Sequence, residues 1–383
     1  MKDTIRASID KTERWLRDHR YKGYDPADGL TSYLRPLTFG NLLLERLLQQ
    51  LIWRSPVNLR PLLGVRERDS FIGRGYIARA YLLLYGISGD DAHRRAAVAC
   101  LDWLMDNKAP GVVHYSWGKL FDFASRGGLA PKLEPITVWT SLIGQAFLDG
   151  YEVLGDRRYL DVADSVCQWL LSVPRTRTDS GSCINYLPRP GDCTIHNQSM
   201  LAAATLTRTA KLTGRREYLD VAGEAILFTC SRQRPDGSWF YGETANRRWI
   251  DNFHTGYNLD ALKSYIELTG DQTYAETLRR GFSFYKTRFF EESGRPRYYH
   301  DRTYPIDSQC AAQSIDTLTY FSDYDEEALG LAVKVATWTI GHMQDPKGHF
   351  YFARYPFFVL KAPMIHWAQA TTFKALAYLL SRM

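Results

Sequence analysis

A glycine that ends an apolar helix recurs about every 60 residues, and this repeat constrains the fold more than any other feature of the chain. The four copies are Gly89, Gly155, Gly214 and Gly270. Glycine adopts positive φ readily, so it commonly terminates a helix, and here a polar residue follows that can open the next helix. Two-helix units of this length cannot bury their apolar faces alone and must stack on one another.

The pattern predicts an all-α (α/α)6 toroid, a six-hairpin barrel. First helices are expected to begin near residues 71, 136, 195, 251, 307 and 363, and second helices near 90, 157, 215, 272 and 325. The last first helix, residues 367–381, has no second helix after it, and the N-terminal helix, residues 4–18, can supply that partner. We therefore expect a single domain over residues 1–383, in which residues 21–69 form an insertion containing a short helix near 41–53.

The connections between hairpins are long, and five of them place aromatic residues soon after a glycine. Alternating aromatic residues after a glycine predict short strands, here at 111–115, 181–186, 237–241, 294–299 and 348–352. All five connections would lie on one side of the ring. Long loops on one face of a repeat fold usually form its binding face.

The first turns of the inner helices carry polar and aromatic side chains in a shared register. Trp139, Gln198 and His254 each stand sixteen residues before a turn glycine. Aromatic rings and hydrogen-bonding groups at one mouth suit a sugar ligand. The candidate substrate-binding residues are Asp25, Asp28, His114, Tyr115, Trp139, His196, Gln198, Tyr241, Gln309, Arg354, Trp367 and Gln369. The competing interpretation is structural, because single histidines and tryptophans are common in protein cores.

Asp251, His254 and Asp307 are the candidate catalytic residues. Asp251 and His254 are three residues apart, so they share one face of a starting helix. Two carboxylates across the mouth would serve glycoside hydrolysis, whereas histidines would serve proton abstraction. Asp251 and Asp307 are also good N-cap residues, which leaves capping alone as the alternative. Arg354 suits a uronate carboxylate. No close metal-ligand spacing is present, so neither a metal nor another cofactor is expected.

Charge and composition limit the partners. The net charge of +6 is dispersed, which permits an acidic glycan but does not predict nucleic-acid binding. Met1–Leu16 is an amphipathic pattern with no secretory signal, and the most apolar stretch, 41–53, is too short and too charged to span a bilayer. We therefore expect a cytoplasmic protein with reduced cysteines, no transmembrane segment and an oligosaccharide or polysaccharide partner, acidic and lipid-linked glycans included.

Three strings give the chain a resemblance to a known family. They are residues 22–30 (KGYDPADGL), residues 251–259 (DNFHTGYNL) and residues 366–370 (HWAQA). The chain resembles VpsJ-type proteins of bacterial polysaccharide-biosynthesis clusters over nearly its whole length. That resemblance implies an α/α six-barrel similar to unsaturated glucuronyl hydrolases and N-acylglucosamine 2-epimerases, with a glycan as ligand. His366 departs from the family pattern, in which arginine is more usual.

Three functions remain open from the sequence. The first is an enzyme that cleaves a sugar, as hydrolase or lyase, or epimerises it. The second is a non-catalytic glycan-binding or assembly factor of an exopolysaccharide cluster. The third is a toroidal cyclase, whose lanthionine type would need a zinc ion held by two cysteines and a histidine, such as Cys183, Cys193 and His196.

Overall fold

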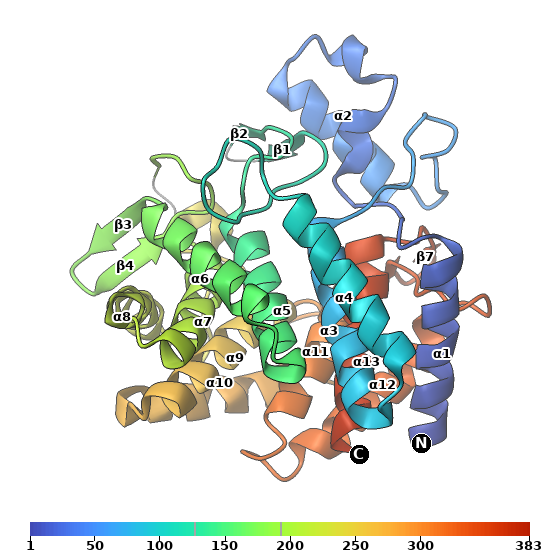
Figure 1. Ribbon diagram of the computed structural model, residues 1–383. Coiled ribbons are helices and arrows are strands. Elements are labelled where there is room, and N and C mark those ends of the chain that lie inside the picture. The colour runs from blue at the N-terminus through green and yellow to red at the C-terminus, as the bar shows by residue number, and fades with distance from the viewer. Residues whose placement is uncertain (126–127, 192–193) are drawn as a thin grey trace.

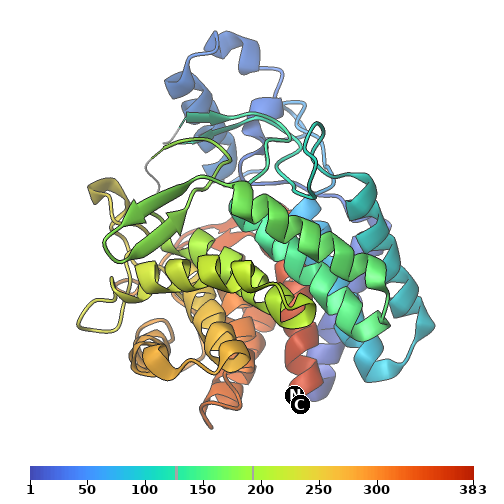
Figure 2. The same ribbon diagram turned by 60° about the vertical axis from the view of Figure 1, so that its left-hand side comes forward.

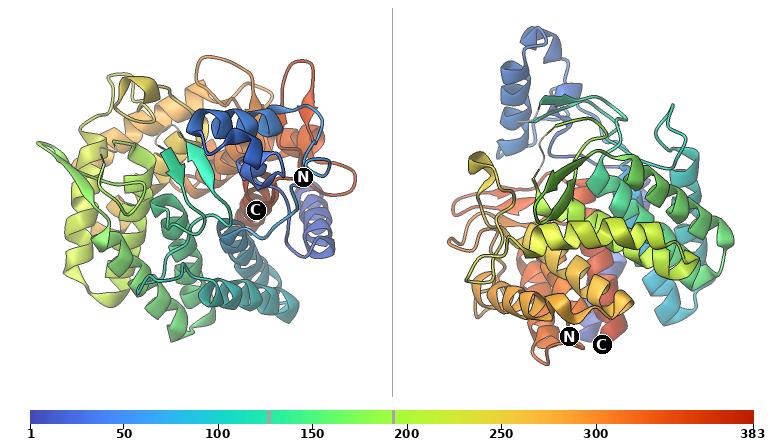
Figure 3. Two further views of the ribbon diagram at one scale, coloured as in Figure 1. Left: turned by 90° about the horizontal axis from the view of Figure 1, so that it is seen from above. Right: turned by 90° about the vertical axis from the view of Figure 1, so that its left-hand side faces the viewer.

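The protein is a closed double ring of helices, seen in a computed structural model that describes residues 1–125, 128–191 and 194–383. Figure 1 and the view from above in Figure 3 show the outer helices wrapped around the inner ones. The inner ring consists of α3(Phe71–Ser88), α5(Thr137–Leu154), α7(His196–Thr213), α9(Asn252–Thr269), α11(Ser308–Tyr320) and α13(Thr371–Arg382). The outer ring consists of α4(Asp91–Asp106), α6(Arg157–Ser172), α8(Arg216–Cys230), α10(Ala275–Arg288), α12(Ala328–Met343) and α1(Lys2–Asp18). Because α13 packs on both α3 and α11, the ring closes, and the expected (α/α)6 toroid is confirmed.

The four turn glycines do what the sequence predicts. Each adopts a left-handed conformation, with φ between 67° at Gly89 and 76° at Gly270, and donates its N–H to the carbonyl four residues earlier. After three of them, at Asp90, Asp156 and Asp271, a carboxylate caps the following helix. The turns gather at one end of the ring, called the turn end here. The N-termini of the inner helices and the long loops form the opposite, loop end.

A second set of glycines holds four of the five long loops against the next outer helix. All have positive φ, and a Cβ built on any of them would collide with helix backbone. That Cβ would lie 2.2 Å from the Glu224 carbonyl oxygen at Gly181, and 2.3 Å from that of Lys11 at Gly348. The four contacts are Gly181 on α8, Gly237 on α10, Gly294 on α12 and Gly348 on α1. The N-terminal helix therefore takes the place of the sixth outer helix.

Most of the expected strands are absent, both where a glycine contacts an outer helix and at Gly111, where it does not. Only 181–184 becomes a strand, β4(Gly181–Ile184), which pairs antiparallel with β3(Arg175–Thr178). The strand prediction is wrong for 111–115, 237–241, 294–299 and 348–352, all described segments that form turns and isolated bridges. The remaining strands are β1(Phe123–Ser125), β2(Gly128–Ala130), β5(Ile306–Asp307), β6(Ala353–Arg354) and β7(Val359–Leu360).

The insertion between α1 and α3 stands above the loop end, where Figures 1 and 2 show it projecting from the ring. It contains η1(Asp28–Thr31), η2(Arg35–Thr38) and α2(Leu42–Arg54). Arg60 pairs with Asp28 at 2.9 Å, and Arg35 bridges Glu45 of α2 to Asp122 of the ring. Short 3-10 turns also occur at η3(Ala245–Arg247) and η4(Gln272–Tyr274), and η5(Ile365–Ala370) is a π-helical turn. Across the described residues, no helix is both long and apolar enough to cross a membrane.

Candidate functional site

Asp251 and His254 form a hydrogen-bonded pair at the start of α9. Asp251 is the N-cap: its Oδ1 accepts the backbone N–H of His254 at 3.0 Å. Its Oδ2 accepts both His254 Nδ1 at 2.8 Å and Trp249 Nε1 at 2.8 Å. Because Oδ2 is an acceptor, Nδ1 carries the proton, and Nε2 of a neutral His254 keeps its lone pair. Asp251 is thus a cap and also the group that fixes the tautomer of His254.

Aromatic rings hold His254 in place. Its ring lies 4.4 Å from that of Tyr241 and 3.8 Å from that of Phe253, and Tyr241 in turn stacks on Trp249 at 4.5 Å. Trp367 meets the edge of Phe253 at 5.9 Å. The side chain of His254 remains 18% exposed, whereas that of Asp251 is fully buried. The accessible member of the pair is therefore the imidazole, and it is surrounded by rings of the kind on which sugars stack.

Asp307 caps the next inner helix, α11, and its pKa is raised. Its Oδ1 accepts the N–H of Gln309 at 2.8 Å and that of Cys310 at 3.2 Å. Burial, with a smaller contribution from the charge of Asp251, outweighs those two hydrogen bonds and raises the pKa of Asp307 to about 7. No cation among the described residues forms an ion pair with it. The two carboxyl groups, on adjacent inner helices, thus have different surroundings: Asp251 accepts hydrogen bonds from His254 and Trp249, whereas Asp307 has a pKa raised to about 7, which suits a general acid.

A second cluster at the loop end surrounds Trp139. Lys119 lies 4.7 Å from the centre of the Trp139 ring and pairs with Asp25 at 3.1 Å. His366 meets the edge of Trp139 at 5.7 Å. Burial lowers the pKa of His366 to about 3, with Lys119 adding to the effect and Asp25 opposing it, so the ring is neutral. Its Nδ1 is buried and has no hydrogen-bond partner among the residues that the structure describes.

Asp25 and Asp28 act within this cluster as structural supports. Asp25 accepts the N–H of Ala27 at 2.8 Å, and Asp28 accepts the N–H of Asp25 at 3.0 Å in addition to its ion pair with Arg60. Burial raises the pKa of Asp28 to about 6, although Arg60 opposes that rise. The two aspartates therefore join the insertion to the ring, and Asp25 also sets the charge beside Trp139.

Several predicted site residues point away from the mouth. His196 is fully buried between the rings: its Nε2 lies 2.8 Å from Glu243 and its Nδ1 3.3 Å from Thr229 of α8. Burial lowers the pKa of His196, although Glu243 opposes the shift. The first residue of α5, Thr137, is likewise turned away from the axis, because it donates a hydrogen bond to the Asn185 carbonyl at 2.6 Å. The first residue of an inner helix therefore faces the outer ring.

Other predicted residues hold loops. Gln198 donates to the Ile184 carbonyl at 2.6 Å, and Gln369 bonds both the N–H and the carbonyl of Phe350. Arg354 reaches the carbonyl of His342, at the end of outer helix α12. Tyr115 packs on Lys108 and donates its backbone N–H to Ser165 Oγ of outer helix α6 at 3.0 Å, with His114 beside it in the same loop. The structure does not bring these side chains to Asp251. Cys193, proposed as a zinc ligand, lies outside the described residues.

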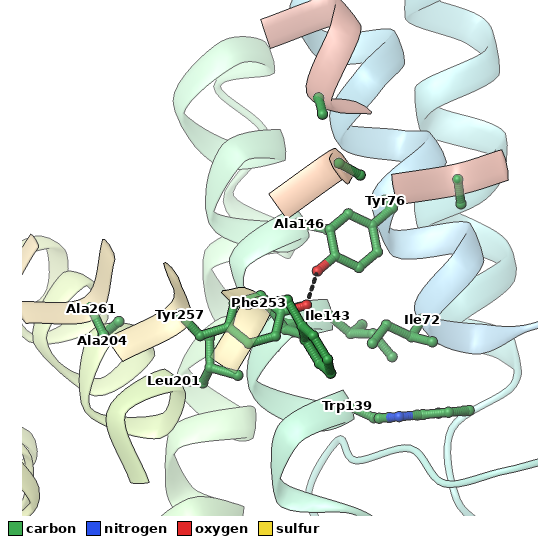
Figure 4. Packing of buried hydrophobic residues seen from close by; sticks show 14 of the residues in the cluster. Ile72, Tyr76, Trp139, Ile143, Ala146, Leu201, Ala204, Phe253, Tyr257 and Ala261 are labelled. Atoms are coloured by element: carbon green, nitrogen blue, oxygen red, sulfur yellow. Dashed lines mark hydrogen bonds between the residues drawn. The ribbon is translucent and has the colours of Figure 1, made fainter. Parts of the chain in front are cut away.

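A tyrosine pair closes the axis of the ring below the mouth. Tyr76 of α3 and Tyr257 of α9 bond through their hydroxyls at 3.1 Å, and Gln309 donates to Tyr257 at 2.8 Å. Figure 4 shows this bond between facing inner helices, with Ile143 and Leu201 beside it. Gln309, a predicted ligand contact, therefore supports Tyr257 from the neighbouring inner helix α11.

On the other side of this pair lies a cavity of about 900 Å³ near the turn end. The sequence analysis did not identify it. Asp260 lines it, bonded to Gln313 at 2.7 Å, and burial together with the neighbouring charge of Asp316 raises the pKa of Asp260 to about 7. Asp316 itself pairs with Lys374 at 2.7 Å. The available signal was a charged ninth residue in three inner helices, at Arg79, Asp260 and Asp316.

The cavity wall contains an ion-pair chain whose centre is Asp149. Arg79 binds one of its oxygens at 2.6 Å and Arg208 the other at 2.6 Å, and Arg208 extends to Glu152. Burial opposes ionisation, but the two guanidinium groups outweigh it and lower the pKa of Asp149 to about 2.

Replacing Asp149 by asparagine is expected to lower the free energy of unfolding by roughly 3–5 kcal/mol, since two buried guanidinium groups would lose their shared charge partner. Urea denaturation at neutral pH measures this. Glu152→Gln, at the exposed end of the chain, is the control and should cost under about 1 kcal/mol. The stability that Asp149 supplies is present above its unfolded pKa, near 4, and is lost as the pH falls toward 2. Equal losses in both variants would contradict this account.

The sequence matches no family profile and no curated protein. Solved structures nevertheless share the fold. A possible GH105 family member from Salmonella enterica serovar Paratyphi A aligns over 99% of this chain and 94% of its own, with a TM-score of 0.66 at 15% identity. A sugar epimerase from a ruminal bacterium aligns over 83% of this chain and 90% of its own, with a TM-score of 0.62 at 12% identity. The GH76 α-mannanase of Bacteroides thetaiotaomicron aligns over 81% of this chain and 85% of its own, with a TM-score of 0.62 at 13% identity. At such identities the likeness establishes the six-hairpin fold, which carbohydrate-active enzymes share.

Proposed function

We propose that this chain is a carbohydrate-active enzyme of the VpsJ type that transforms a sugar by general acid–base chemistry at the loop end. The carrying observation is the pair of carboxyl groups on α9 and α11. Asp307 is about half protonated at neutral pH, while Asp251 accepts three hydrogen bonds and orients His254. The aromatic rings around His254 supply stacking surface for a sugar, and the shared fold of epimerases and glycoside hydrolases supports the class.

Each group has a distinct role in this chemistry. Nε2 of His254 takes a proton, either from a water molecule or from a sugar carbon beside a carbonyl, and Asp251 stabilises the imidazolium that forms. Asp307 donates a proton to the oxygen on which negative charge develops. Trp367 and Tyr241 hold the sugar ring. The same proton transfers serve cleavage of a glycosidic bond and epimerisation, so the substrate decides between them.

The proposal is tested by incubating the protein with cellobiose, mannose and uronate-containing oligosaccharides in D₂O. Mass spectrometry detects deuterium incorporation, which reports proton exchange at carbon, and a reducing-end assay detects cleavage. Turnover that is lost in His254→Gln but kept in His342→Gln, an exposed histidine on α12, would support the proposal. Sugar binding by calorimetry without turnover of any substrate would favour the alternative, a non-catalytic glycan-binding or assembly factor.

Activity is expected to fall as the pH rises through about 7, because Asp307 must be protonated to act as the acid. Above that pH, kcat/KM should decline about tenfold per pH unit. A kcat/KM profile measures the decline. The pKa of Asp260 is also raised to about 7, but Asp260 lies on the turn-end side of the tyrosine pair. Asp260→Asn should therefore show the same decline in kcat/KM. If the decline were absent in Asp260→Asn, it would be due to the cavity instead.

A further inference from the structure

Half of the large hydrophobic side chains that the described structure exposes belong to one short segment of the insertion. Ten of the twenty lie between residues 33 and 62, and Phe39 is 88% exposed, Leu62 73% and Leu51 69%. The apolar crest, as we call this surface, consists of Tyr33, Leu37, Phe39, Leu42, Leu43, Leu44, Leu47, Leu51, Val57 and Leu62. Figures 1, 2 and 3 show the segment that carries it standing clear of the ring. Exposed apolar surface of this extent marks an interaction site.

Helix α2 is reversed relative to an ordinary surface helix. Its buried face contains Ile52 but also Glu45, which pairs with Arg35 of η2, and Gln49, which bonds the backbone of Ala124 in β1. Leu43, Leu47 and Leu51, four residues apart, form an outward stripe instead. A helix covering a core in water does the opposite. The stripe is therefore not needed to pack the ring and is left uncovered by the rest of the described structure.

The charge on the crest identifies that environment. Glu45 is the one carboxylate in residues 31–64, and Arg35 neutralises it. Arg46 and Arg54, at the middle and end of α2, form no ion pair with any described residue. Leucine and aromatic residues with unpaired arginines match the boundary between headgroups and acyl chains of an anionic bilayer. The same crest on a second copy of the chain would offer these two arginines no carboxylate, because Glu45 is already paired with Arg35.

We propose that the apolar crest docks this protein peripherally on an anionic lipid surface. The leucine stripe enters the headgroup–acyl boundary to a depth of roughly 5–10 Å, and the two arginines bind lipid headgroups. The docking stands independently of the chemistry proposed above. One consequence for the substrate rests on that chemistry. Trp53 of α2 lies 6.5 Å from Phe352, and Arg54 acts electrostatically on Tyr299 beside Asp251, so the loop-end site would open next to the bilayer and suit a glycan carried on a lipid.

Vesicle sedimentation tests the docking without any activity assay. The intact chain should bind vesicles of phosphatidylcholine mixed with phosphatidylglycerol and bind phosphatidylcholine alone much less. Leu43→Ser, Leu47→Ser and Phe39→Ser should each weaken partitioning roughly tenfold. Arg46→Gln and Arg54→Gln should each weaken it roughly fivefold, and only on the anionic vesicles. The matched control, Leu212→Ser with Leu227→Ser, changes two exposed leucines on the body of the ring and should bind like the unaltered chain.

Three results would overturn the proposal. In the first, the unaltered chain remains in the supernatant with both vesicle types. In the second, the crest variants sediment with the vesicles as much as the unaltered chain does. In the third, sedimentation velocity shows a dimer that Leu43→Ser dissolves, which assigns the crest to a second copy. Because the altered side chains are exposed, the variants should melt at the temperature of the unaltered chain, and circular dichroism verifies that folding is intact. Failure of catalysis would leave all of these readouts unchanged.

Discussion

Asp251→Asn is expected to lower kcat by roughly a hundred- to ten-thousand-fold while changing sugar affinity little. Asparagine can still cap α9 through its carbonyl oxygen, so the bond to the His254 backbone survives. Its NH₂ group would then meet two further donors, His254 Nδ1 and Trp249 Nε1, which now share one carboxylate oxygen. The histidine would lose the partner that fixes its tautomer and stabilises its charged form. Steady-state kinetics with the substrate found in the D₂O screen measures the loss.

The control for this experiment is Asp271→Asn. Asp271 caps η4 at the turn end by accepting the N–H of Thr273 at 2.9 Å, and it is partly exposed. It shares the capping role of Asp251 but not the contact with a histidine, so its asparagine variant should keep full activity. If Asp251→Asn also kept full activity, Asp251 would be a cap alone and the catalytic role would be wrong.

Removal of the first twenty residues is expected to abolish cooperative folding. Helix α1 buries Ile5, Ile9, Trp15 and Leu16 between α12 and α13. At roughly 1.5–3 kcal/mol for each large apolar side chain, the loss approaches the whole free energy of unfolding of a typical domain. It would also uncover the partner faces of α12 and α13. Thermal melting followed by circular dichroism should show a broad transition or none.

The matched truncation removes residues 381–383, which are exposed at the other end of the chain. This variant should melt within a few degrees of the full-length protein, since it removes no buried side chain. A sharp, unshifted melt after loss of α1 would mean that the ring is stable while open between α12 and α13, contrary to the closure described above.

The ring could be predicted from the sequence because its determinants are local. A glycine with positive φ, a capping residue after it and an apolar period set each hairpin, and the helix left over at each end fixed the closure. The loops could not be predicted in the same way. Gly237 and Gly294 have the composition of strand starts, yet their function is to let loop backbone touch an outer helix, a contact between segments distant in sequence. Such tertiary contacts override local β-propensity.

The site was predictable only in part, and the reason is rotation about the helix axis. Successive residues of an α-helix point in directions that differ by about 100° around its axis. Two side chains in the first turn can therefore lie at a similar height and still face different ways. His196 and His254 are both in the first turn of an inner helix, but His196 turns outward to α8 while His254 stays beside Asp251. The protonation of Asp307 depends on burial, which the sequence does not reveal. The charged cavity was not predicted because its charged residues lie in the third turn of the inner helices, whereas the predicted site residues lie in the first.

The closure of the ring by α1 has a consequence for how the protein is made. Met1 and Met383 lie at the same end of the ring, where Figure 2 shows the two termini together, and α1 packs on α12 and α13. Helix α1 is therefore synthesised long before α12 and α13, the helices on which it packs. At typical elongation rates of about 5–20 residues per second, Ile5 and Ile9 stay unburied for roughly 20 seconds or more on the ribosome. A nascent chain of this protein presents an uncovered amphipathic helix throughout translation, which makes its first seventeen helical residues a natural segment for a chaperone to hold.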